Sequence, residues 1–293
     1  MRVLIAGAGG MVGRALVEHC AKGGDKVFAY DRERLDITND VAIREAFARD
    51  KPDTVINCAA WTDVDGCERD QEQAYLINDK AVGRLAVNCR QSAASFVTIS
   101  TDYIFDGAKE GFYTQRDDPN PTSIYGKAKL AGERCAQASC ARTTVVRTGW
   151  IFGSGGRNFL SKVFDYARSG QPLKAIEDSF GTPTYAPDLA RRLRELAELD
   201  LPGVYHVVNA GAGTSYADFT RRALRAAQIQ DAKLESVSMN LLPRPAPRPR
   251  NSRLRCLLSE AINLPPLQNW ESALDDFARS FTGQTEAAAN RSS

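Results

Sequence analysis

The stretch "RVLIAGAGGMVG" at residues 2–13 decides the fold of this 293-residue chain. Its first half is a mostly aliphatic run that predicts a buried strand. Its second half places Gly7, Gly10 and Gly13 in G-x-x-G-x-x-G spacing, just before a helical pattern. Glycines between a strand and a helix permit a tight turn and let a pyrophosphate approach the start of the helix. The stretch therefore predicts a dinucleotide-binding turn.

Strands and helices alternate through the first two thirds of the chain. Several runs are nearly continuous in apolar and β-branched character, which is typical of strands buried on both faces. Helical patterns, such as residues 12–24 and 40–51, lie between them. This alternation predicts an α/β fold of the Rossmann type, with a doubly wound parallel sheet. The predicted strands are residues 2–7, 26–30, 54–60, 95–100, 143–148 and 204–209.

The chain is expected to form two domains that exchange segments. After about residue 150 the alternation ends, and glycine and proline become more frequent. The first expected domain is a Rossmann domain that binds a dinucleotide. The second is a smaller, interleaved C-terminal domain that binds a substrate. The last residues have little apolar surface to bury and are expected to be disordered. The expected ranges are 1–150 with about 182–209 for the first domain, 151–181 with 210–282 for the second, and 283–293 for the disordered tail.

A second distinctive stretch, "LPRPAPRPRNSRL", occupies residues 242–254 and is called the arginine segment below. Its prolines favour an extended backbone, and an extended backbone can present several arginines to one anion. We therefore expect this segment to cross a substrate cleft. A proline-rich ligand for another protein is the alternative.

Composition and charge exclude several classes of protein. The chain is 43% hydrophobic and 25% charged, and its net charge of +2 gives no reason to expect nucleic acid or an anionic membrane as partner. No apolar run approaches the ~20 residues of a membrane-spanning helix, so we expect a cytoplasmic protein. Two histidines and seven scattered cysteines offer no cluster of ligands, so no metal site is predicted.

The second predicted strand is followed by Asp31, near the distance at which a ribose-binding acid is expected. Its carboxylate would accept hydrogen bonds from the ribose of NADH, whereas Arg32 would hold the 2′-phosphate of NADPH, so both cofactors stay open. Asp36 and Ile37 are expected to flank the adenine. The other residues expected to contact the cofactor are Met11 and Val12 in the glycine turn, Ala59, Ala60 and Trp61 at the end of the third predicted strand, and Tyr125 and Lys129.

Tyr125 and Lys129 stand four residues apart in "SIYGKAKLAGE" (123–133), which predicts that both lie on one face of a helix. A neighbouring ammonium is expected to lower the pKa of the tyrosine from its usual value of ~10. Such a tyrosine can exchange a proton with a carbonyl or alcohol oxygen. Thr101 follows the fourth predicted strand in "ISTDYIFDG" (99–107), and its hydroxyl can hydrogen-bond the same oxygen. These three residues predict a proton-transfer site.

Together these motifs resemble the extended short-chain dehydrogenase/reductase family. Within it, six segments resemble the dTDP-4-dehydrorhamnose reductases, in the order of that family and over nearly the whole chain to about residue 280. The departures are at single positions, such as Cys58 in place of alanine and Gly149 in place of serine. The segments are "NCAAWTDVDGCE" (57–68), "STDYIFDG" (100–107), "PTSIYGKAKLAGE" (121–133), "RTGWIFG" (147–153), "FGTPTYAPDLA" (180–190) and "RPRNSRL" (248–254).

The resemblance implies an NAD(P)H-dependent oxidoreductase that reduces the C4 ketone of a dTDP-4-keto-6-deoxyhexose, foremost dTDP-4-dehydrorhamnose. Tyr125 would protonate the sugar oxygen, Lys129 would orient the nicotinamide ribose, and Thr101 would hydrogen-bond the sugar. A homodimer is one expectation, because stable oligomers are common in this family. The residues expected to contact the dTDP-sugar are Thr101, Asp102, Tyr103, Trp150, Asn158 and Arg250, the last of them at the diphosphate.

Two other functions stay open on this fold. One is a nucleotide-sugar epimerase or 4,6-dehydratase, and the other is a non-catalytic regulator resembling the β subunit of methionine adenosyltransferase. Dehydratases of this fold typically place an Asp-Glu pair after the strand-end threonine, whereas this chain has Asp102-Tyr103. A phenol with an ordinary pKa of ~10 is a poor base for a proton next to a ketone, so the sequence favours a reductase.

Overall fold

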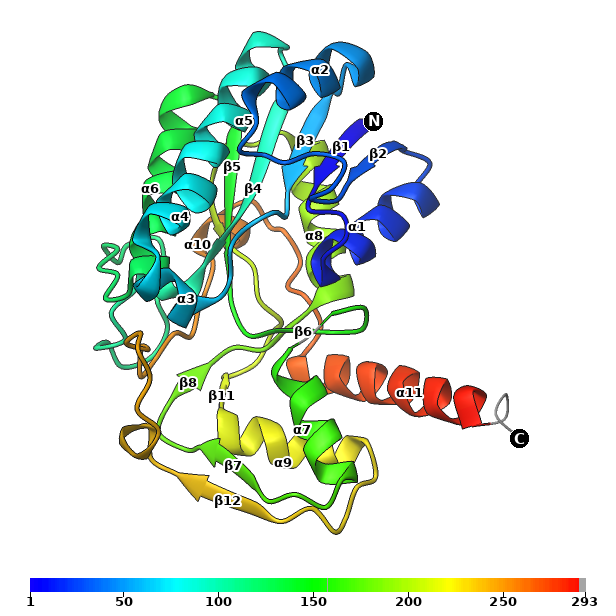
Figure 1. Cartoon of the computed structure of the whole chain (residues 1–293), viewed down its shortest axis with the longest axis vertical. Coiled ribbons are helices and arrows are strands. Elements are labelled where there is room, and N and C mark those ends of the chain that lie inside the picture. Colours follow the sequence, from blue (N-terminus) through cyan, green and yellow to red (C-terminus); the bar gives the residue numbers. More distant parts are fainter. Residues whose placement is uncertain (157, 290–293) are drawn as a thin grey trace.

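A parallel sheet of six strands forms the centre of the first domain (Figure 1). The computed structural model describes residues 1–156 and 158–289. The strands lie in the order β10-β5-β4-β3-β1-β2, and every neighbouring pair is parallel. They are β1 (Arg2–Ala6), β2 (Lys26–Tyr30), β3 (Thr54–Asn57), β4 (Ser95–Thr101), β5 (Thr143–Thr148) and β10 (Gly203–His206).

All six predicted strands are present, and the order of the sheet reverses at β1. β2 lies on one side of β1, while β3, β4, β5 and β10 follow on the other. In a parallel sheet with such a reversal, ligands bind in the crevice at the carboxyl ends of the strands. The glycine turn after β1 and Thr101 at the end of β4 lie at this same edge.

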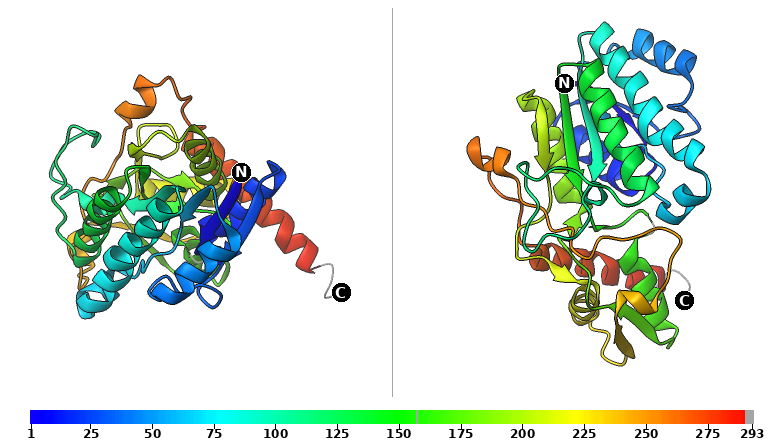
Figure 2. Two further views of the ribbon diagram at one scale, coloured as in Figure 1. Left: turned by 90° about the horizontal axis from the view of Figure 1, so that it is seen from above. Right: turned by 90° about the vertical axis from the view of Figure 1, so that its left-hand side faces the viewer.

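Helices cover both faces of the sheet (Figure 2). One face packs against α1 and α8, and the other packs against α2, α5 and α6. This burial on both faces accounts for the continuous apolar runs of the strands and confirms the predicted doubly wound α/β fold. The helices of this domain are α1 (Met11–Lys22), α2 (Asp40–Asp50), α3 (Val64–Arg69), α4 (Gln71–Tyr75), the π-helix η1 (Leu76–Lys80), α5 (Ala81–Gln91), the 3₁₀ helix η2 (Asp102–Ile104), α6 (Ile124–Ser139) and α8 (Ala186–Leu199).

The second domain lies beyond the carboxyl edge of the sheet (Figure 1). Its core contains Phe152, Phe219 and Phe277. The ring centroid of Phe152 lies 5.5 Å from that of Phe219 and 5.8 Å from that of Phe277. Its short strands pair two by two, β6 with β9, β7 with β12 and β8 with β11. The elements are β6 (Ile151–Phe152), α7 (Phe159–Arg168), β7 (Leu173–Ile176), β8 (Phe180–Gly181), β9 (Thr184–Tyr185), β11 (Thr214–Ser215), α9 (Tyr216–Ala226), β12 (Leu234–Val237), the 3₁₀ helix η3 (Met239–Leu241) and α11 (Trp270–Ala289).

Residues 254–267 depart from the expected domain ranges, because they return to the first domain. The short helix α10 (Leu257–Ala261) packs beside β10, and Leu267 joins the apolar cluster that contains Leu193 of α8. Leu258 and Ile262 pack against the same cluster. Burying these side chains covers the edge of the sheet at β10. The other expected domain boundaries stay predictions.

Helix α11 is longer than the sequence predicts. It continues to Ala289, where the sequence predicts a disordered tail from residue 283, and the disorder of this tail stays a prediction. Alanine is the strongest helix former, and three alanines end the helix at 287–289. Residues 290–293 of the expected tail lie outside the described residues.

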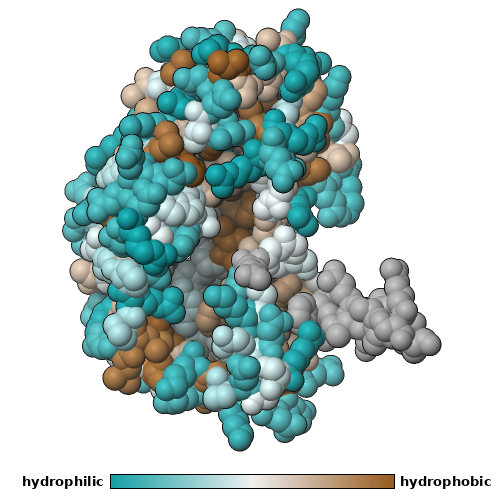
Figure 3. Space-filling model, in the orientation of Figure 1, coloured by the Kyte–Doolittle hydropathy of each residue, from teal (hydrophilic) through white to brown (hydrophobic). Residues whose placement is uncertain are grey.

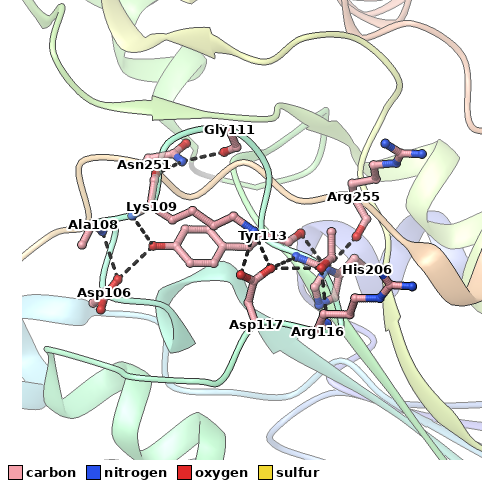
Figure 4. A network of polar contacts seen from close by, with 11 residues as sticks. Asp106, Ala108, Lys109, Gly111, Tyr113, Arg116, Asp117, His206, Asn251 and Arg255 are labelled. Carbon is pink, nitrogen blue, oxygen red and sulfur yellow. Dashed lines mark hydrogen bonds and ion pairs between the residues drawn. The ribbon is translucent and has the colours of Figure 1, made fainter.

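The carboxyl half of the arginine segment is tied on both sides, in a set of contacts that we call the clamp, and Figure 4 shows the side at Asn251. On one side, Asn251 Nδ2 donates to the carbonyl oxygens of Lys109 and Gly111, each at 2.6 Å. On the other side, the backbone N–H of Phe180 donates to the carbonyl oxygen of Arg250 at 2.7 Å. The segment therefore runs between the loop at 109–113 and β8.

Candidate active site

Gly7 and Gly13 shape the turn between β1 and α1, because neither position has room for a side chain. Gly7 has a φ of +77°, and a Cβ there would lie 2.6 Å from the backbone nitrogen of Ala59. A Cβ at Gly13 would lie 2.2 Å from the carbonyl oxygen of Gly7. Both glycines therefore let α1 approach the ends of β1 and β3.

Gly10, in contrast, is not required by the packing of the chain. A Cβ on it would meet the carbonyl oxygen of Gly7 at 3.4 Å, an ordinary contact. Gly10 is the N-cap of α1, and within the described residues no side chain caps this helix start. Uncapped N–H groups and the positive end of the helix dipole fit a phosphate. The turn thus fits the pyrophosphate of NAD(P)H, with the backbone of Met11 and Val12 as donors.

We expect Gly10→Val to weaken NAD(P)H binding by ~tenfold or more, about 1.4 kcal/mol, because the added methyl groups enter the space of the pyrophosphate. Gly10→Ala should have a smaller effect, since its Cβ fits. Fluorescence titration measures the affinity for both cofactors, and the thermal unfolding midpoint controls for folding. Equal affinity of the wild type and a folded Gly10→Val variant would contradict this assignment.

The ribose end of the predicted cofactor site offers charges of both signs. Asp31 Oδ1 accepts a hydrogen bond from the backbone N–H of Arg34 at 3.0 Å. Arg32 is exposed, whereas the guanidinium of Arg34 donates to the carbonyl oxygen of Ala29 at 3.1 Å. One carboxylate and two exposed arginines, of which Arg34 is hydrogen-bonded within the chain, therefore lie where NADH and NADPH differ.

The structure changes the expected roles of Asp36 and Ile37. The Asp36 carboxylate accepts hydrogen bonds from the backbone N–H and the hydroxyl of Thr38, at 2.9 and 2.8 Å. Ile37 is buried in the apolar core with Leu4 of β1 and Val55 of β3. Its side chain therefore cannot flank an adenine, and the backbone of this pair is what the adenine could reach.

Ala59, Ala60 and Trp61 follow β3 and are half-buried. The Oδ1 atom of Asn57 accepts from the backbone N–H of Ala59 at 3.0 Å. The side-chain amide of Asn78 binds the backbone of Trp61 twice. Its Oδ1 accepts from the N–H of Trp61 at 2.9 Å, and its Nδ2 donates to the carbonyl oxygen of Trp61 at 3.0 Å. Side-chain amides thus fix this turn beside the glycine turn, and its contact with the cofactor stays a prediction.

Thr101, Tyr125 and Lys129 converge where α6 crosses the end of β4. Tyr125 is buried and hydrogen-bonded to Thr101. Lys129 is also buried, and its Nζ donates to the carbonyl oxygen of Ile99 on β4 at 2.6 Å. The three predicted catalytic residues are therefore brought together, and their roles stay predictions.

Local sequence signals place α6 at this distance from β4. The Oγ of Ser123 accepts from the backbone N–H of Gly126 at 3.1 Å and so starts the helix. A Cβ at Gly126 would lie 2.3 Å from the carbonyl oxygen of Tyr103. A glycine in the first turn therefore lets Tyr125 approach the end of β4.

The expectation that Lys129 lowers the pKa of Tyr125 is not met. Burial raises the pKa of Tyr125 well above its usual value, and the hydrogen bond with Thr101 opposes this only in part. Burial lowers the pKa of Lys129 to about 8, against the opposing effect of Glu133. The ammonium of Lys129 donates to the carbonyl oxygen of Ile99, and the burial of Tyr125 favours the neutral phenol, which is the form that can donate a proton.

Asp102 lies behind the site and not in it, which contradicts its expected contact with the sugar. It is 3% exposed, and a Cβ at Gly149 would lie 2.4 Å from its carboxyl carbon. Oδ1 accepts from the hydroxyl of Thr101 at 3.1 Å, whereas Oδ2 has no hydrogen-bond partner in the described part of the chain. Burial raises the pKa of Asp102 to about 6, and the nearby side chains of Ser252 and Thr101 oppose the rise. The unusual Gly149 thus leaves room for a carboxyl that orients Thr101.

A cavity of about 420 Å³ opens beside Tyr103. The space-filling view shows a hollow between the two domains, with apolar residues inside it (Figure 3). Apolar walls with a few convergent cations fit a nucleotide base and its diphosphate. The lining includes Phe159, Ile176, Tyr216, Met239 and Leu242 with the cations Lys174, Arg244 and Arg248.

Arg248 is the anchored cation of this cavity. Its guanidinium pairs with both carboxylate oxygens of Asp65 on α3, at 2.6 and 3.0 Å. Asp65 also accepts from the backbone N–H of Ala246 at 3.0 Å. Burial raises the pKa of Tyr103 to about 12, and a hydrogen bond with Arg248 opposes the rise. A carboxylate of the first domain thus fixes an arginine of the second beside Tyr103.

Arg250 and Asn158 do not have the positions expected for substrate contacts. Arg250 is exposed and is not one of the residues that line the cavity. Its backbone is fixed in the clamp, where its carbonyl oxygen accepts from the N–H of Phe180. Asn158 caps α7, with Oδ1 accepting from the N–H of Ser161 at 3.1 Å and Nδ2 donating to the carbonyl oxygen of Gly153 at 2.9 Å. Its amide is therefore occupied within the chain.

Sequence reasoning missed Tyr216, which lines the cavity at the start of α9. Its ring stacks on Trp150 with centroids 3.6 Å apart. Trp150 has a φ of +50°, and a Cβ at Gly181 would lie 2.2 Å from its indole ring. Trp150 thus supports Tyr216 between β8 and α9, and its own contact with substrate stays a prediction. The cap at Ser215 could have located the helix start but not the direction of the phenol.

His206, one of the two histidines, has a structural position. Its Nδ1 lies 3.2 and 3.0 Å from the carbonyl oxygens of Tyr113 and Arg255, beside the clamp (Figure 4). Across residues 1–156 and 158–289, no three acidic, histidine or cysteine side chains gather as a metal site. Every helix in that same part of the chain is too short or too polar to cross a membrane.

Comparison with known proteins places most of this chain in one family. The family model described as "RmlD substrate binding domain" matches residues 1–282. The chain belongs to the RmlD substrate binding domain family. A curated relative, the dTDP-4-dehydrorhamnose reductase of Mycolicibacterium smegmatis, is 36% identical over 287 residues, with 97% of this chain and 87% of the relative covered.

Two solved structures support the same RmlD family assignment. The chain is similar to the crystal structure of a dTDP-4-dehydrorhamnose reductase from Clostridium acetobutylicum, with a TM-score of 0.93, 35% identity, and 96% and 100% of the two chains covered. It is also similar to the dTDP-4-dehydrorhamnose reductase of Bacillus anthracis in complex with NADP, with a TM-score of 0.91, 30% identity, and 94% and 97% covered. The resemblance to these reductases, inferred from the sequence, is confirmed.

Proposed function

We propose that this RmlD-family protein is an NAD(P)H-dependent reductase of the C4 ketone of a dTDP-4-keto-6-deoxyhexose. The foremost substrate is dTDP-4-dehydrorhamnose, and the product is then dTDP-L-rhamnose. The observation that carries the proposal is the buried phenol of Tyr125, hydrogen-bonded to Thr101 at the carboxyl edge of a dinucleotide-type sheet. The relatives named above are reductases of such a sugar, and one of them was solved with NADP.

The residues of the glycine turn hold the cofactor in this proposal. The first turn of α1 binds the pyrophosphate, and Asp31 or Arg32 binds the adenosine ribose or its phosphate. The hydride that reduces the ketone comes from bound NAD(P)H. Lys129 lies one helical turn beyond Tyr125, which suits a hydrogen bond to the nicotinamide ribose.

Tyr125 supplies the proton in the same reaction. Its phenol donates to the oxygen on C4 of the sugar as negative charge develops there, and the hydroxyl of Thr101 hydrogen-bonds that oxygen. In the structure the single hydroxyl proton of Thr101 goes to Asp102 at 3.1 Å, so Thr101 has to turn this proton from Asp102 to the sugar oxygen when the substrate binds.

The cavity beside Tyr103 binds the nucleotide in this proposal. Its apolar and aromatic walls take the base and deoxyribose, while Arg244 and Arg248 face the diphosphate. Arg248 is already fixed by Asp65, so little side-chain freedom is lost when the diphosphate binds.

The site favours reduction over elimination of water. A dehydratase needs an acid and a base beside the sugar, but the phenol of Tyr103 has its pKa raised by burial to about 12. The neighbouring carboxyl group, on Asp102, is buried away from the cavity. No general base for a carbon acid thus follows Thr101 in the described residues.

A turnover assay with freshly prepared dTDP-4-dehydrorhamnose tests the proposal. We expect one equivalent of NADH or NADPH to be oxidised for each sugar reduced, and a preference between the cofactors below ~hundredfold, about 2.7 kcal/mol. Formation of a 4-keto-6-deoxy sugar from dTDP-glucose with catalytic NAD⁺ would instead identify a dehydratase. A protein inert in both assays would support the regulatory alternative.

Two further expectations from the sequence stay predictions. One is a homodimer, which the mass of the protein in solution tests. The other is a cytoplasmic location, which fractionation of the cells tests.

A further inference from the structure

Behind the proposed site, buried polar side chains form a network with Glu133 at its centre. Glu133 lies one helical turn after Lys129 and two after Tyr125, on the same face of α6. Its carboxylate accepts from Nε and Nη2 of Arg147 on β5, at 3.1 and 2.7 Å, and from the hydroxyl of Ser100 on β4. Glu133 is 3% exposed, and both partners are buried as well.

The position of this ion pair points to a role beyond stability. A buried ion pair is often no more stabilising than apolar side chains of the same volume. Here the pair joins the helix that carries Tyr125 to the two strands beneath it, one of which ends in Thr101. Its carboxylate is also one turn away from the ammonium of Lys129, which is 4% exposed.

We propose that Glu133 is a positioning residue, which keeps Lys129 charged and directed at the end of β4 and so holds Tyr125 against Thr101. The inference rests on the proposed reductase function and concerns the same site. The buried ammonium donates to a neutral carbonyl oxygen, that of Ile99 at 2.6 Å, and the charge of Glu133 acts on it from one helical turn away. A buried charge needs a charge of opposite sign nearby, and Glu133 supplies it.

The groups that face Lys129 come from three elements. Glu133 and Tyr125 lie on its own helix, Cys58 follows β3, and Arg147 of β5 lies behind Glu133. Burial lowers the pKa of Lys129 to about 8, while Glu133 and Cys58 raise it. Without the charge of Glu133 the pKa falls further, so Lys129 loses its proton at a pH where the wild type keeps it.

The test is the pH profile of kcat for Glu133→Gln, with sugar and NADPH saturating. We expect the falling limb of kcat at high pH to move down by about one unit, so that kcat falls by ~twofold at pH 7 and by ~tenfold at pH 9. Asp25→Asn is the matched control, because Asp25 is buried and paired with Arg194 far from the site. This control should leave the profile unchanged. Activity of the wild type tests the reductase proposal separately.

Two other variants cover the case in which Glu133→Gln does not fold. Glu133→Leu combined with Arg147→Met removes both charges of the buried pair, and Ser100→Ala removes one hydrogen bond without burying a charge. Both should move the high-pH limb in the same direction, Ser100→Ala by less. The inference would be overturned if folded Glu133→Gln, or the folded double variant, had the pH profile of the wild type. If Ser100→Ala is the variant that folds, a pH profile equal to that of the wild type would overturn it as well.

Discussion

Replacement of Tyr125 by phenylalanine is expected to lower kcat by ~10³-fold, about 4 kcal/mol in activation free energy. The phenol is the group placed to protonate the sugar oxygen, and phenylalanine removes the proton but keeps the ring. The ring packs edge-on against Tyr103 with centroids 6.0 Å apart, so the fold and the affinity for cofactor should not change. Steady-state turnover, cofactor titration and thermal unfolding measure these three quantities.

Tyr103→Phe is the matched control, because it removes a phenol from the other ring of this pair. We expect it to lower kcat by less than ~tenfold, since Tyr103 lines the cavity but is not placed to donate the proton. Burial raises the pKa of Tyr125, so this phenol should stay protonated well above neutral pH. A Tyr125→Phe variant that keeps more than ~a tenth of the rate would mean that the proton comes from another group.

Arg248→Ala is expected to raise the KM for the dTDP-sugar by ~hundredfold, about 2.7 kcal/mol, with little change in cofactor affinity. The guanidinium lines the cavity and is the cation that Asp65 holds in place. Truncation removes both its charge and its contact with Tyr103. Initial rates over a range of sugar concentrations measure KM.

Arg250→Ala is the matched control from the same segment, because Arg250 is exposed and outside the cavity lining. We expect its KM to stay within ~threefold of the wild type. Asp65→Asn should raise KM less than Arg248→Ala does, because it loosens the arginine without removing its charge. If Arg250→Ala has the larger effect, the diphosphate binds outside this cavity.

The fold could be predicted because its signals are local. Each strand is a short apolar run, and the run at residues 2–7 ends in glycines whose spacing matches the packing of α1 on β1. Tyr125 and Lys129 follow from helical spacing alone, and Thr101 from its place at a strand end. Signals that are local in sequence thus identify the catalytic residues, and contacts between α6 and β4, such as that of Lys129 with Ile99, bring them together.

The substrate half could not be predicted, because contacts between distant residues decide it. Arg248 and Arg250 have the same chemistry and lie two positions apart, and the partner of Arg248, Asp65, stands on α3 of the other domain. Asn158 was expected to contact the substrate, but its side chain caps the N-terminus of α7. Ile37 was expected at the adenine, but the core takes its side chain.

Because residues 254–267 return to the first domain, a newly made chain cannot complete the fold of this domain until these residues have been synthesised. β1 to β5 leave the ribosome long before α10 and Leu267, which cover part of the same core. Contacts between such distant segments form slowly, and apolar surface left open on an unfinished chain favours aggregation. The arginine segment enters its place between the loop at 109–113 and β8 late in synthesis as well. The glycine turn can therefore form early in synthesis, whereas the nucleotide cavity is among the last parts of the protein to be completed.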